Sequence, residues 1–106
     1  MRQYELMMIV DPSLSTEDRD ALVSEIETEL SNVGAKIVET NHPGERELAY
    51  KIRGSLQGYY LLYTLEKESG DFLEAVKTFN IKPSIWRFMF VRTDAYFLIF
   101  LYAYDQ

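Results

Sequence analysis

The chain lacks cysteine, and this absence excludes disulfides, a thiolate nucleophile and cysteine-based metal sites. It has a single histidine, His42, and no glycine-rich loop of the kind that cradles phosphate groups. No set of residues has the spacing of metal ligands. The sequence therefore predicts no cofactor, no metal and no small-molecule substrate.

Hydrophobic runs long enough to cross a bilayer are missing as well. The apolar run near the N-terminus is short and ends at Asp11-Pro12, whereas a membrane-spanning helix needs about 20 apolar residues. It has the features of neither a signal peptide nor a membrane anchor. We expect a cytosolic chain that begins at Met1 and has no membrane partner.

The chain also lacks an excess of basic residues, because its formal net charge is −6 over 106 residues. Proteins that bind polyanions usually show a basic surface, so this charge argues at first against nucleic acid. The acids are unevenly placed, however: residues 16–32 hold six acids and one base, and the rest holds eleven acids and ten bases. A basic surface elsewhere on the molecule remains compatible with the composition.

Residues 44–63 give the firmest structural signal, two strands joined by a short polar turn. Apolar and polar side chains alternate along residues 47–53, the period of a half-exposed strand. In the second strand, Tyr59, Leu61, Tyr63 and Leu65 share one side, and Tyr60, Leu62, Thr64 and Glu66 share the other. Between them the stretch from Gly54 to Gly58 has a glycine at each end, which favours a turn. This pattern predicts a β-hairpin.

The rest of the chain alternates between strand and helix patterns. Strands are predicted over residues 3–10, 35–40 (interrupted by Asn41–Gly44) and 84–93. One helix is expected to follow Ser15 as N-cap and to end at Gly34, and a second to follow Ser69 or Asp71 and end at Asn80. Their predicted core residues are Leu22, Ile26, Leu30 and Val33 in the first helix, and Phe72, Val76 and Phe79 in the second.

This order is βαββαβ, which predicts an α+β, ferredoxin-like domain: a four-stranded antiparallel sheet with two helices on one face. The first and third strands are apolar on both sides and should be central. We expect this domain to span residues 1–93. Residues 94–106 form a separate C-terminal tail, uncharged from 95 to 104, which we expect to pack on the open sheet face or on a partner.

Candidate catalytic residues are scarce. His42 lies beside a proline and a glycine and is predicted to be a solvated loop residue. Acylphosphatases share the βαββαβ order but need an arginine in the first strand–helix connection, where this chain has only residues 11–15, DPSLS. We therefore predict that the protein is not an enzyme.

Aromatic and basic residues leave two interpretations open. The stretch from Gln57 to Tyr63 resembles the start of an RNA-recognition motif. However, Gln57 stands where the motif has a lysine or arginine, and Leu61 stands where it has an aromatic residue. Arginines and lysines scattered along the strands either protect sheet edges from pairing or contact RNA phosphates. Spacing alone does not separate these two roles.

Several segments together resemble bacterial small-subunit ribosomal protein six. The combination of two segments is specific to this family: MRQYE at residues 1–5 and GERELAYKI at residues 44–52. The resemblance extends from residue 1 to about residue 93. Two features depart from the family pattern: Glu47 stands where a second arginine is common, and the tail is apolar. The other matching segments are Asp11-Pro12, Gly58-Tyr59-Tyr60 and residues 85–92, IWRFMFVR.

This resemblance implies a non-enzymatic component of the small ribosomal subunit, in a bacterial or organellar ribosome. It implies binding to the central domain of the small-subunit rRNA as a heterodimer with small-subunit ribosomal protein eighteen. The alternative is a ferredoxin-like protein-interaction or ligand-sensing module that dimerises through a sheet edge and the tail. Carried over by position, the expected phosphate ligands are Arg2, Arg46, Arg87 and Arg92, with Tyr4, Tyr50 and Lys51 as supporting contacts.

Overall fold

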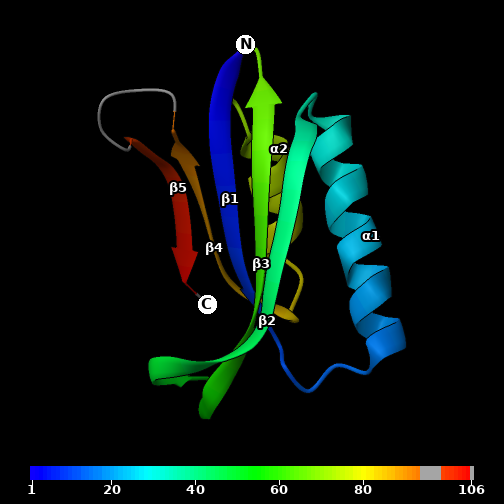
Figure 1. The fold of residues 1–106 in the computed structure, drawn as a ribbon, viewed down its shortest axis with the longest axis vertical. Coiled ribbons are helices and arrows are strands. Elements are labelled where there is room, and N and C mark those ends of the chain that lie inside the picture. Colours follow the sequence, from blue (N-terminus) through cyan, green and yellow to red (C-terminus); the bar gives the residue numbers. More distant parts are fainter. Residues whose placement is uncertain (94–98, 106) are drawn as a thin grey trace.

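The computed structural model describes residues 1–93 and 99–105 of the chain. It has one antiparallel sheet with strand order β2-β3-β1-β4-β5, and both helices pack on the same face of it (Figure 1). The predicted fold is confirmed, including the central position of the first and third strands. The elements are β1 (Arg2–Val10), α1 (Thr16–Asn32), β2 (Lys36–Ile52), β3 (Ser55–Lys67), α2 (Leu73–Asn80), β4 (Ile85–Arg92) and β5 (Ile99–Asp105).

The main core lies between the helices and the sheet. Alternate residues of β1, β3 and β4 point into it, as the period of two requires. From α1 it receives Leu22, Ile26 and Leu30, as the spacing predicts, while Val33 is only partly buried. Helix α1 begins where expected, because the hydroxyl of Ser15 accepts a hydrogen bond from the backbone N–H of Asp18 (3.1 Å).

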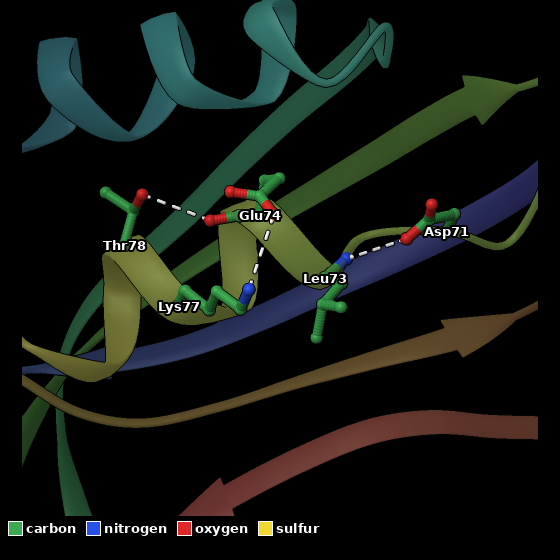
Figure 2. Close-up of polar contacts among 5 residues, drawn as sticks. All are labelled: Asp71, Leu73, Glu74, Lys77 and Thr78. Carbon is green, nitrogen blue, oxygen red and sulfur yellow. Dashed lines mark hydrogen bonds and ion pairs between the residues drawn. The ribbon is translucent and has the colours of Figure 1, made fainter.

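Helix α2 begins slightly later than predicted. Its N-cap is Phe72, whose ring is fully buried, and the carboxylate of Asp71 accepts a hydrogen bond from the backbone N–H of Leu73 at 3.1 Å (Figure 2). Asp71 therefore still satisfies one of the free donors at the helix start. The other contacts in Figure 2, the Lys77–Glu74 ion pair and the hydrogen bond from Thr78 to the Glu74 carbonyl, are exposed and add little.

Strand β2 differs from the prediction, because it runs without interruption through Asn41–Gly44. The pairing with β3 shifts register between Asn41 and Gly44, so the proline lies in a bulge where no ladder hydrogen bond is required of it. His42 is half-buried here, with its ring edge-on to Tyr63 at 5.0 Å. The prediction of a solvated loop histidine was wrong.

The hairpin turn is shorter than predicted. Ile52 pairs with Ser55, so the turn consists of Arg53 and Gly54, both with positive φ (50° and 77°). Positive φ at both central residues is the pattern of a type I′ turn. Gly58 consequently lies inside β3 rather than in the turn.

The described part of the tail, residues 99–105, does not lie across the open sheet face, and the remaining tail residues, 94–98 and 106, are outside the described residues. Residues 99–105 form β5, which pairs antiparallel with β4 at the edge of the sheet (Figure 1). The sheet thus gains a fifth strand. Opposite the helices, the end of the hairpin packs on Ile9 and Trp86, and the rest of this face has no covering element in the described part of the chain.

Candidate nucleic-acid interface

The predicted contact residues separate into two groups at opposite ends of the sheet. Arg87 is the third residue of β4, and Arg92 ends the strand. Five steps along a strand, at about 3.4 Å each, place their backbones about 17 Å apart. We call the residues near Arg92 the N-terminal group (Arg2, Lys67, Arg92) and those near Arg87 the hairpin group (Arg46, Tyr50, Lys51, Arg87).

The hairpin group is organised by a contact between Arg87 and Tyr50. One terminal nitrogen of Arg87 donates a hydrogen bond to the Tyr50 hydroxyl at 2.6 Å, and the guanidinium carbon lies 5.3 Å from the ring centroid. Tyr50 nevertheless remains 59% exposed. The structure therefore brings together two predicted residues that are far apart in sequence, and it fixes the direction of the guanidinium.

A second apolar cluster on the open face holds this end of the hairpin in place. It consists of Ile9, Leu48, Ile52 and Trp86, with Tyr60 packed against them. Because the cluster joins the hairpin to β1 and β4, the end of the hairpin bends away from the line of the strands (Figure 1). This bend brings the side chain of Tyr50 into contact with that of Arg87.

Arg46 and Lys51 are exposed on the same hairpin. Arg46 donates one hydrogen bond to the carbonyl of Glu45 at 2.8 Å, which ties the side chain to its own strand. Lys51 directly follows Tyr50 along β2. With Arg87, Arg46 and Lys51 give the hairpin group three cationic side chains.

The N-terminal group joins the start of β1 to the ends of β3 and β4. Arg2 pairs in register with Lys67, and Arg92 pairs with Tyr4, two residues further along β1. The ammonium of Lys67 lies 5.8 Å from the centroid of the Phe72 ring. Lys67 was missed at the level of sequence, because only the β1–β3 register brings it beside Arg2.

Tyr4 is not a surface residue. Its side chain is fully buried, and its ring packs edge-on against Phe72 at 5.1 Å. It therefore offers no surface for contact with RNA, and its expected role as a supporting contact is replaced by a role in the core.

Tyr63 is a buried tyrosine that contacts an acidic residue of α1. Burial raises the pKa of the Tyr63 hydroxyl far above its usual value, and the neighbouring charge of Glu27 adds to this shift. The phenol consequently stays protonated and donates a hydrogen bond to Glu27 at 3.1 Å. Within residues 1–93 and 99–105, no three metal-ligating side chains come together, and no helix is long and apolar enough to span a membrane.

Comparison with known families decides the identity. The family model described as Ribosomal protein S6 matches residues 3–92. The chain belongs to the ribosomal protein S6 family. It is 37% identical to the small ribosomal subunit protein bS6 of Fusobacterium nucleatum over 94 residues, covering 89% of this chain and all of that one.

Two further S6 proteins extend the comparison. The bS6 protein of Koribacter versatilis is 37% identical over 93 residues, which cover 88% of this chain and 63% of that longer chain. The crystal structure of 30S ribosomal protein S6 from Thermotoga maritima superimposes with a TM-score of 0.82 at 27% identity, covering 87% of each chain. The S6 domain is thus shared in sequence and in fold, whereas β5 lies beyond the family match, which ends at residue 92.

Membership in the S6 family establishes the general role. The chain is a structural protein of the small ribosomal subunit, and the predicted ribosomal location in the cytoplasm is confirmed.

Proposed function

We propose that this S6 chain binds the central domain of the small-subunit rRNA together with small-subunit ribosomal protein eighteen, and that it catalyses no reaction. The observation that carries this proposal is the hairpin group, in which Arg87 is held by Tyr50 and flanked by two more cations. A guanidinium with a fixed direction suits the oxygens of a phosphate group. Phosphate contacts of this kind position a protein on folded RNA without reading bases.

The two basic groups support contacts at two points of one RNA fold. The N-terminal and hairpin groups lie at opposite ends of a sheet whose backbone spans them rigidly. Contacts with two separated clusters of phosphates would fix the orientation of the protein on the RNA as well as its position. RNA shape is thereby recognised, since a different fold would not present phosphates at both ends.

The negative charge of the chain supports a basic protein partner. With a formal net charge of −6, binding to RNA alone is expected to be moderate, because the acidic surface is repelled by phosphates. A basic partner neutralises part of that surface and adds its own phosphate contacts. Binding to RNA should therefore be stronger in the presence of protein eighteen than in its absence.

The test is the salt dependence of binding to a central-domain rRNA fragment, with and without protein eighteen. Replacing Arg87 by alanine is expected to weaken binding about tenfold and to reduce the slope of log K against log salt by about 0.9 per lost phosphate contact. Arg87→Lys should keep the slope but bind more weakly than the wild type, because lysine cannot reproduce the planar fork. Tyr50→Phe should weaken binding less than Arg87→Ala, by removing the hydroxyl that directs the guanidinium.

Lys77→Gln provides a matched control, since it removes an exposed cation from α2, away from both basic groups. It should leave both the affinity and the salt slope close to wild type. If Arg87→Ala behaves like Lys77→Gln, Arg87 is a structural residue and the hairpin group is not the RNA contact. If wild-type binding is unaffected by protein eighteen, the proposed partner is wrong.

A further inference from the structure

Strand β5 lies outside the part of the chain that matches the S6 family, and it forms one edge of the sheet. The match ends at residue 92, and β5 spans Ile99–Asp105. Within the described part of the chain β5 pairs with β4 alone (Figure 1). Because alternate residues of an antiparallel strand direct their N–H and C=O groups to opposite sides, about half of these groups in β5 face away from the sheet. They form a free edge on which a further strand can pair.

The opposite edge of the sheet is protected against such pairing. Strand β2 contains Pro43, and its register with β3 shifts at three places, so its outer edge is not a regular row of backbone groups. Proline, bulges and charge are the features by which natural sheets prevent association through their edges. The charged residues along β2 are Lys36, Glu39, Glu45, Arg46, Glu47 and Lys51.

Strand β5 has almost none of these protective features. It contains no proline, and its one charged residue, Asp105, stands at its end. Its pairing with β4 has a single irregularity, which skips Leu101. Residues that favour strands, namely isoleucine, phenylalanine and tyrosine, make up most of its sequence, IFLYAYD. A free edge with this composition is typical of a strand that pairs with another chain.

The charge of β5 favours a second copy of this chain as the partner. Residues 95–104 are uncharged, so they offer no opposite charge to RNA phosphates or to basic side chains. Two copies that each carry a net charge of −6 repel each other, but an uncharged strand adds nothing to that repulsion. A second copy can therefore approach along β5 more easily than along a charged edge.

Two-fold symmetry makes β5 complementary to itself. Two antiparallel copies of one strand form the same backbone hydrogen bonds on both sides of the axis. When the whole of β5 overlaps, Tyr102 lies at the axis, and the two Asp105 residues lie at opposite ends. Six residues of about 3.4 Å each then separate them by about 20 Å. The charged residues of the two strands therefore do not meet.

We propose that the chain, free of RNA, forms a two-fold symmetric dimer in which β5 pairs antiparallel with β5 of a second copy. The two five-stranded sheets become one continuous sheet with a protected β2 at each outer edge. Assembly stops at two copies, because the pairing consumes the one unprotected edge of each chain. This inference goes beyond the proposed function and depends neither on RNA binding nor on protein eighteen.

Sedimentation equilibrium of the purified full chain, without RNA and over a range of concentrations, tests the proposal. The wild type is expected to follow a monomer–dimer equilibrium. Tyr102→Lys places two lysines next to each other at the axis of the dimer, so it should raise the dimer Kd about tenfold or more. Val38→Lys is the matched control, because it adds the same charge at an exposed position of β2. It should leave the Kd close to that of the wild type.

Hydrogen–deuterium exchange locates the interface without any substitution. Backbone amides of residues 99–105 should exchange more slowly as the wild-type concentration rises, because those on the free edge gain hydrogen-bond partners. Amides of β2 should exchange at the same rate at every concentration. Circular dichroism of Tyr102→Lys checks that the S6 domain stays folded, since the substitution lies beyond residue 92.

Three results would overturn the proposal. The first is a wild-type chain that sediments as a monomer at every concentration, and the second is a series of species larger than the dimer, which would show that the β2 edge pairs as well. The third is a dimer that Tyr102→Lys leaves intact or whose slowed exchange lies outside β5, because its interface would then be elsewhere.

Discussion

Replacing Phe72 by alanine is expected to lower the free energy of unfolding by about 3–5 kcal/mol. The ring is fully buried, stacks on Phe90 with centroids 4.2 Å apart, and meets Tyr4 edge-on. Alanine would leave a cavity where α2 joins β1 and β4, because the surrounding strands can collapse only partly. Urea unfolding followed by circular dichroism measures the loss.

The neighbouring substitution Leu73→Ala provides the control. Leu73 is 46% exposed and lies one position further into α2, so its loss should cost less than about 1 kcal/mol. Similar losses for the two variants would contradict the placement of Phe72 as the anchor of α2.

Replacing Gly58 by valine should destabilise the fold by about 3 kcal/mol, the upper part of the range for overpacking. A Cβ atom at this position would lie 2.6 Å from Cγ2 of Ile9 and 3.1 Å from Cδ2 of Leu48. Both neighbours belong to the apolar cluster that holds the hairpin. Displacing them moves Tyr50 away from Arg87, so RNA binding should also weaken at temperatures where the variant is folded.

Ala49→Val is the control for Gly58→Val, because it also introduces a valine, here on the exposed side of β2. It should change the free energy of unfolding and the RNA affinity very little. If Gly58→Val has the same free energy of unfolding as the wild type, Gly58 does not lie in close contact with Ile9 and Leu48. If Gly58→Val is destabilised but binds RNA normally, the Arg87–Tyr50 contact does not depend on the hairpin.

Much of the fold could be predicted because its signals are local. The N-cap at Ser15 and the four-residue spacing of Leu22, Ile26 and Leu30 specify α1 without reference to the rest of the chain. The alternation in β1 even indicates that Tyr4 shares a face with Leu6, and both side chains are fully buried. The family resemblance pointed to Tyr4 as an RNA contact, whereas the structure places its side chain in the core.

Other features depend on pairing between distant segments. Pro43 reads locally as a strand breaker, yet the register with β3 provides a bulge that accommodates it. The apolar composition of the tail predicts that it packs against other residues, but it does not predict which surface it packs on. That β4 has an exposed edge is known only once the strand order is known.

The candidate interface is predicted only in part for the same reason. Arg87 and Tyr50 could be chosen individually from the family motifs, but their contact requires the bend of the hairpin over the open face. Lys67 joins Arg2 through register alone. Sequence patterns identify the kinds of residue, and the sheet determines which of them meet.

Incorporation into reconstituted small subunits would show whether this chain is a ribosomal component that binds the central domain. Small-subunit rRNA would be assembled with purified bacterial small-subunit proteins from which the S6 protein is omitted, and this chain would be added and followed by sedimentation and mass spectrometry. We expect the chain to co-sediment with the particle and to protect central-domain nucleotides from chemical probing, more strongly when protein eighteen is present. A chain that stays at the top of the gradient, with the central domain unprotected, would contradict its assignment as a structural component that binds this RNA.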